Sequence, residues 1–248
     1  MGPSLSNQKH GAPLRLCSYF QGDNLAEWSL TSKVLSLHFM KSRRIALSSI
    51  GRASYTFNSL KFLRVLDLEF TVIDSFPEAL TCLRYVAVRI AEDSSLSFSK
   101  IAGTFETLIV KGIGGRVSLP DTIWKMVKLR HLHIYNPWFS RVEDAENIFR
   151  KISNLQKLRC EVSKRFPAFN NLTKLEMLKF SGGPLWSWAS DLNLPPSLKK
   201  LTLSNCWVSS LDQVATLPRL VVLKLLQVII TSKVMGSGPM SSSFTSNS

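Results

Sequence analysis

The chain has 248 residues, of which 45% are hydrophobic, so it is long and apolar enough to bury a large core. Its formal net charge of +14 has three possible explanations: an acidic protein partner, a nucleic acid partner, or a surface whose charges only interact with water. The sequence contains no apolar run long enough for a transmembrane helix and no apolar segment of the secretory kind near its first residues. The four cysteines, Cys17, Cys82, Cys160 and Cys206, have no CxxC spacing, and we expect reduced thiols in a cytoplasmic protein.

The first 32 residues are poorly patterned and predict a lead-in before the ordered repeats. Residues 33–39 look like a degenerate first strand, as expected for a terminal repeat that faces water on one side. Repeat character then continues to residue 230, so the sequence predicts a domain over residues 33–230 with about eight to nine repeats. Residues 231–248 are rich in serine and predict a disordered tail. Apolar residues just before this tail lack a cap, which suggests a chain that stops short of a longer solenoid.

One motif recurs through this domain, with an apolar residue, most often leucine, at the first, fourth and sixth positions of each copy. Successive copies start between 20 and 26 residues apart, as from Leu63 to Leu83 and from Leu129 to Leu155. The eight copies start at Leu63, Leu83, Phe105, Leu129, Leu155, Leu175, Leu198 and Leu220. This spacing is the signature of leucine-rich repeats.

The motif predicts an α/β solenoid, and specifically a leucine-rich-repeat horseshoe. The fourth and sixth positions lie on one face of a short strand, and stacking each strand on the next buries them together. We therefore expect short parallel strands on the concave face, with irregular loops and short helices on the convex face. Prolines at Pro77, Pro120 and Pro167 predict the starts of such helices, because proline is well tolerated in a first helical turn.

Polar residues between the buried leucines are expected to line the concave face. They carry both signs of charge in the N-terminal repeats and are mostly basic in the C-terminal repeats. The second residue of each copy, such as Arg64, does not fit strict alternation and is expected at the start of its strand. The candidate protein-binding surface consists of Arg84, Tyr85, Arg89, Arg130, His131, His133, Tyr135, Lys157, Arg159, Lys179, Lys199 and Lys200.

An acidic protein surface is the favoured partner for these residues. Nucleic acid is less favoured, because the sequence has no recognition helix, RNA-binding motif or zinc-knuckle spacing. A third interpretation, that the charges only keep a solenoid soluble, stays open.

Catalytic and cofactor-binding motifs are absent from the sequence, including the P-loop, the zinc-protease and serine-hydrolase motifs and the protein-kinase set. His131 and His133 would project from one face of one strand, but a zinc site needs three or four ligands and no third is placed. We therefore expect a protein that is not an enzyme and holds neither a cofactor nor a metal.

Several blocks resemble the leucine-rich repeats of plant intracellular immune receptors, the coiled-coil nucleotide-binding leucine-rich-repeat disease-resistance proteins. Leu60–Glu69 and Leu83–Val88 look like their first repeats, and Leu119–Leu132 is similar to their LPxxIWxMxxLRHL block. The lead-in residues Arg15–Cys17 and Asp23–Trp28 resemble the linker before the repeats in the late-blight-resistance subgroup. The resemblance covers most of residues 14–228.

The resemblance implies a protein-binding module of plant innate immunity. In that family the repeats sense a pathogen effector or a guarded host protein and restrain a nucleotide-binding switch, whose activation leads to the hypersensitive response. This sequence carries neither the coiled coil nor the nucleotide-binding domain, so a truncated receptor is expected. The alternative is a leucine-rich-repeat adaptor or scaffold, for example in ubiquitin ligation, although residues 1–32 supply no F-box helical module.

Overall fold

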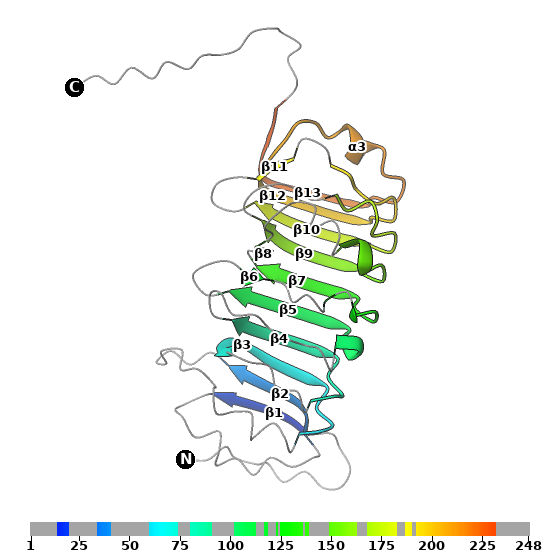
Figure 1. Ribbon diagram of the computed structural model, residues 1–248. Helices are drawn as coiled ribbons and strands as arrows, with labels where there is room; N and C mark the ends of the chain where they lie inside the picture. The colour runs from blue at the N-terminus through cyan, green and yellow to red at the C-terminus, as the bar shows by residue number, and fades with distance from the viewer. Residues whose placement is uncertain are drawn as a thin grey trace, which may run out of the picture.

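The protein is a ladder of short parallel strands stacked in chain order (Figure 1). The computed structural model describes residues 14–19, 34–40, 60–73, 80–90, 102–112, 117–118, 123, 125–135, 137–138, 149–162, 168–182, 187–189 and 192–231. The main 11-stranded sheet contains β1 (Leu14–Tyr19), β2 (Val34–Met40), β3 (Val65–Ile73), β4 (Tyr85–Ile90), β5 (Thr107–Gly112), β7 (His131–Tyr135), β9 (Lys157–Val162), β10 (Met177–Gly182), β11 (Ser187–Ala189), β12 (Lys200–Val208) and β13 (Val222–Ile230). A second sheet pairs β6 (Val117–Ser118) with β8 (Pro137–Trp138). The predicted solenoid of parallel strands is confirmed.

The strand register follows the repeated motif residue by residue. The fourth motif residue of each copy lies beside the fourth of the next, so that Leu108 pairs with Leu132 and Leu132 pairs with Leu158. The sixth residues align in the same way, as Val110 does with Ile134. From β3 to β12 these two rows are buried, each residue being no more than 2% exposed. A slip of one residue would turn every leucine of a strand toward water, so the motif fixes the register.

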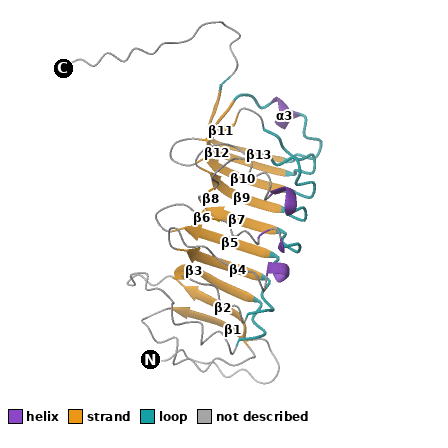
Figure 2. Ribbon diagram, in the orientation of Figure 1, coloured by secondary structure: helices purple, strands orange, loops and turns teal. Residues whose placement is uncertain are grey.

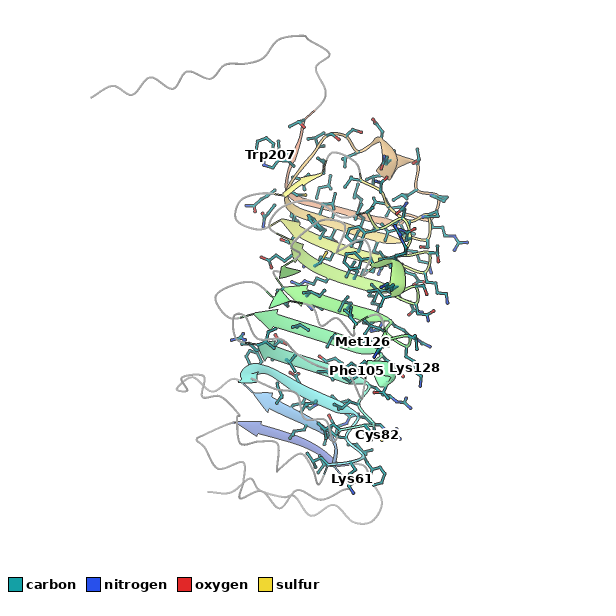
Figure 3. The ribbon with its side chains drawn as sticks, viewed as in Figure 1. Lys61, Cys82, Phe105, Met126, Lys128 and Trp207 are labelled. Carbon is teal, nitrogen blue, oxygen red and sulfur yellow. The ribbon has the colours of Figure 1, made fainter. Side chains whose placement is uncertain are left out.

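A tight turn precedes most strands and buries the first motif residue. The amide of Leu63 donates to the carbonyl of Leu60 (3.0 Å), and the same turn ends at Leu129, Leu155, Leu175 and Leu198. Both ends of the turn are apolar and buried, while its two middle residues are exposed or half-buried. Figure 3 shows this edge, where Lys61 and Lys128 lie outside and the first motif residue Phe105 lies inside.

The second residue of each motif copy bridges neighbouring repeats through its carbonyl. The carbonyl of Arg64 accepts hydrogen bonds from the amides of Arg84 (2.8 Å) and Tyr85 (3.0 Å). The same pair of bonds recurs at Arg84, Glu106, Arg130, Gln156, Glu176 and Lys199. These residues stand just before their strands, as expected from the break in alternation, and their side chains project at the edge of the sheet.

Two residues bend the chain within the last strands. Asn205 in β12 and Gln227 in β13 have positive φ angles of 50° and 52°. Asparagine adopts this left-handed conformation more readily than most residues because its short amide can bond locally. Cys206 follows the first of these turns and is completely buried, and burial raises the pKa of its thiol to about 11.

Helical turns and loops lie on the opposite side of the molecule from β11 and the C-terminal end of β12 (Figure 2). The described helical residues are η2 (Ala102–Thr104), residues 123 and 125, residues 149–151 and α3 (Asp212–Ala215). Phe149 and Phe169 pack from this side with ring centroids 5.3 Å apart. The helix starts predicted at Pro77, Pro120 and Pro167 lie outside the described residues.

Two described strands, β1 and β2, lie near the predicted N-terminal limit of the repeat domain. The degenerate first strand is present as β2, and β1 lies within the predicted lead-in and pairs with β2 in parallel. The boundary at residue 32 stays a prediction. The tail after Thr231 lies outside the described residues.

The outer face of β13 carries exposed apolar side chains. Leu223 and Leu225 are 42% and 38% exposed, whereas their neighbours in β12, Leu201 and Leu203, are fully buried. Leu226, Ile229 and Ile230 are also exposed, as the sequence suggested. In the part of the chain that the structure describes, no helix is both long and apolar enough to cross a bilayer.

Candidate binding surface

The outward-facing strand residues form three columns that run along the stack. The first column follows the register Tyr85, Thr107, His131, Lys157, Met177 and Lys200. The second follows Asp67, Ala87, Ile109, His133, Arg159, Lys179, Thr202 and Lys224. The third contains Arg89, Lys111, Tyr135, Glu161 and Ser181. We call these columns together the concave surface.

Two close contacts between a basic and an acidic side chain lie in the N-terminal part of the concave surface. The Lys111 ammonium contacts the Glu69 carboxylate, and His38 lies 3.6 Å from Asp67. Tyr85 stands near both carboxylates, and the pKa of its phenol is raised. Burial is the largest cause, and the negative charges of Asp67 and Glu69 add to it. The charge of Lys111 is therefore neutralised within the protein, whereas Arg89 forms no ion pair with a described carboxylate and its Nε atom is buried without a described hydrogen-bond partner.

The C-terminal part of the concave surface is different. Lys157, Arg159, Lys179, Lys200 and Lys224 form no ion pair with any carboxylate that the structure describes. The carboxylate of Glu161 is an outward-facing acid among them. These cations come from neighbouring strands, which are about 4.8 Å apart in a parallel sheet. They define a concentrated positive region, which we call the basic half of the concave surface.

Tyr135 is the centre of a group of rings and cations where the two parts meet. The Lys111 ammonium lies 4.4 Å from the centroid of the Tyr135 ring, and the Arg159 guanidinium lies 5.2 Å from it. The His133 ring centroid is 4.3 Å from that of Tyr135. Cation–π attraction holds long flexible side chains in one place. The attraction offsets the conformational freedom that these side chains lose.

A hollow of about 120 Å³ opens beside Tyr135. Its lining includes His133, Tyr135, Arg159, Glu161, Lys179 and Ser204. The Nε2 atom of His133 is buried and has no hydrogen-bond partner among the described residues. A buried polar atom without a partner costs stability.

The environment of His133 lowers its pKa to about 4. Burial is the largest cause, followed by the positive charges of Arg159, Lys111 and Lys179. Burial and the charges of Lys157 and Arg130 also lower the pKa of His131, whose Nδ1 lies 3.2 Å from the Thr107 hydroxyl. Both imidazoles are therefore neutral at pH 7, and the positive charge of the surface comes from lysine and arginine.

Stability should consequently fall in mild acid. The pKa of His133 is about 4 when folded and 6.5 in the unfolded reference, so between these values the unfolded chain binds a proton that the folded chain does not. Lowering the pH from 7 to 5 therefore favours unfolding, and His133→Gln should reduce that dependence. Urea unfolding of both proteins at the two pH values measures this effect, and NMR titration of the imidazole tests its origin. A His133 midpoint near 6.5 would contradict the argument.

The structure brings most of the predicted surface residues together. The first column contains Tyr85, His131, Lys157 and Lys200, the second contains His133, Arg159 and Lys179, and the third contains Arg89 and Tyr135. Arg84, Arg130 and Lys199 lie instead in the row at the strand starts, where Arg84 pairs with Glu106 (3.7 Å) and Lys199 with Glu176 (2.9 Å). Their carbonyls bridge the repeats, so their side chains stand at the edge of the concave surface.

Sequence reasoning did not select Ser181 and Ser204, which line the hollow, or Thr107, which contacts His131. Both serines directly follow a sixth motif position, and that register position is the signal that could have identified them. Their small side chains leave the space that the hollow occupies.

Among the described residues, no group of three histidine, cysteine or acidic side chains could hold a metal ion. The buried thiol of Cys160 has its pKa raised to about 12 by burial, so it is protonated at neutral pH and a poor nucleophile.

This register of buried leucines and outward polar columns defines the protein as a leucine-rich-repeat solenoid. No protein-family model matches the sequence. Individual proteins do match it. The putative late blight resistance protein homolog R1B-16 of Solanum demissum is 36% identical over 226 residues, which cover 78% of this chain and 18% of that protein. A second putative late blight resistance protein homolog of the same species is 37% identical over 254 residues, covering 83% of this chain and 32% of that protein.

The chain is thus a leucine-rich-repeat protein homologous to part of the late blight resistance protein homologs. A further relative, homolog R1B-23, is 35% identical over 227 residues, which cover 75% of this chain and 18% of that protein. The chain spans less than a third of the length of each of these relatives.

Proposed function

We propose that this chain is a protein-recognition module of plant disease resistance that acts in the cytoplasm. Its concave surface would bind a pathogen effector, a guarded host protein or an acidic face of the receptor's nucleotide-binding switch. Binding of the last kind would restrain the switch until a pathogen signal releases it.

The observation that carries the proposal is the basic half of the concave surface. Five cations stand there without an ion-pair partner among the described carboxylates, while in the N-terminal part Lys111 pairs with Glu69 and only Arg89 lacks such a partner. Uncompensated charge of one sign steers a complementary partner and sets its orientation. Extended concave surfaces of repeat proteins serve as binding surfaces, which favours recognition over catalysis.

The resistance-protein relatives support the biological setting. Their names describe disease resistance, and this chain matches only a small share of their length. A natural candidate for the partner is therefore the part of such a relative that lies outside the matched stretch. No described feature supplies the helical module that the ubiquitin-ligase adaptor alternative needs.

The proposal predicts that the chain associates with the remainder of homolog R1B-16 when the two are produced as separate fragments in leaf cells. The double variant Lys157→Glu/Lys200→Glu should weaken that association about tenfold, because two attractive contacts become repulsive. Co-immunoprecipitation gives the first measurement and surface plasmon resonance of the purified fragments gives the second.

The matched control is Lys61→Glu/Lys128→Glu, which makes the same change in net charge at exposed turn positions away from the concave surface (Figure 3). This variant should bind within about twofold of the unaltered chain. Equal losses in the two variants would reduce the association to nonspecific charge. An absence of association with this fragment would remove the proposed restraint of the switch.

A further inference from the structure

We infer that the hollow beside Tyr135 is a subsite for one carboxylate side chain of an acidic protein segment. The inference rests on the proposed function and deepens it, because it names the chemistry of the group that the concave surface recognises. The subsite is formed by Arg159 and Lys179, with Tyr135 and His133 as its walls.

Arg159 and Lys179 can reach the same bound group. They are register partners in the neighbouring strands β9 and β10, and both line the hollow. Arg159 also lies against the ring of Tyr135, which holds its guanidinium at the rim of the hollow. A planar guanidinium matches the two oxygens of a carboxylate, and a lysine ammonium adds a point charge beside them.

The charge of the hollow favours an anion. Its lining carries two cations, Arg159 and Lys179, and one carboxylate, Glu161, which leaves one uncompensated positive charge. Lys111 stands nearby but contacts Glu69, so its charge is already partly neutralised. His133 also lines the hollow and forms one of its walls.

The rings of the hollow favour a protein side chain over a nucleic acid. The hollow of about 120 Å³ is large enough to accept a carboxyl group. Proteins that bind single-stranded nucleic acids present aromatic faces on which bases stack. The ring of Tyr135 already contacts Lys111, Arg159 and the ring of His133, so a base would have to displace them.

The test uses the full chain and a fluorescein-labelled glutamate peptide, with binding measured by fluorescence anisotropy. Arg159→Gln/Lys179→Gln should weaken binding about tenfold, and Arg159→Lys should weaken it about threefold, because the charge is kept and the paired hydrogen-bond geometry is lost. The matched control Lys61→Gln/Lys128→Gln removes the same charge and should change affinity less than about twofold. Circular dichroism and thermal unfolding confirm that each variant is folded.

Equal losses in the two double variants would overturn the subsite and leave only a general attraction to a basic protein. A labelled thymidine oligonucleotide of the same charge provides the second comparison. Tighter binding of the oligonucleotide, lost in Arg159→Gln/Lys179→Gln, would assign the hollow to nucleic acid and overturn the inference. Peptide binding that depends on these two residues, without association of the chain with the R1B-16 fragment, would keep the subsite and reject the partner proposed above.

Discussion

Replacing Phe105 by alanine is expected to lower the free energy of unfolding by about 3–5 kcal/mol. Phe105 takes the place of leucine at the first motif position, and its ring is fully buried below the start of β5. Alanine would remove most of that apolar surface and leave a cavity between two repeats. Because each repeat packs mainly on its neighbours, the loss acts on both adjoining interfaces. Urea unfolding followed by circular dichroism measures the change in midpoint.

The control is Phe62→Ala, which removes the same side chain from the middle of a turn. Phe62 is 57% exposed, so its replacement should cost less than about 1 kcal/mol. Similar shifts in the urea midpoint for the two variants would show that the first motif position does not close the repeat interface.

Introducing lysine at Leu203 is expected to unfold the C-terminal repeats, at a cost of about 3–5 kcal/mol. Leu203 is fully buried between β10 and β13, where an ammonium would have neither water nor a carboxylate to pair with. Limited proteolysis of residues 175–231 and the circular-dichroism signal measure the loss of structure.

Its matched variant is Leu225→Lys, because Leu225 is the register partner of Leu203 in β13. Leu225 is 38% exposed, so a lysine there can extend its ammonium into solvent while its stem covers the strand. We expect the same protease resistance as in the unaltered chain and a lower tendency to self-associate. Equal sensitivity of the two variants would mean that the face of β13 is covered in solution.

The sequence was sufficient to predict the strands of the eight motif copies and their register, because the same residue types recur at the same motif positions. It gave no signal for β1, β6, β8 and β11, which lie outside the motif copies. Leu108, Leu132 and Leu158 can be aligned from the amino-acid sequence alone, since each occupies the fourth position of its copy. The anomaly at Arg64 also indicated the strand start, and the shared carbonyl that bridges two repeats explains it.

The candidate surface could be predicted only in part. Arg84, Arg130 and Lys199 were grouped with the concave residues because the motif gives their spacing and not the direction of a side chain that precedes a strand. The contact between Lys111 and Glu69 joins residues 42 positions apart and depends on the conformations of two long side chains. No periodicity encodes such a choice, and the hollow beside Tyr135 likewise depends on how the side chains of neighbouring strands are arranged.

The alternation of buried and outward positions along each strand has an evolutionary consequence. A substitution at Lys157 or Lys179 changes the chemistry of the concave surface. It leaves Leu158 and Leu178, the buried residues beside them in sequence, unchanged. Surface substitutions of this kind usually alter stability by no more than about 0.5 kcal/mol. Selection can therefore change the concave columns one residue at a time while the leucines keep the scaffold intact, and under the proposed function each such step would alter binding specificity in a chain that still folds.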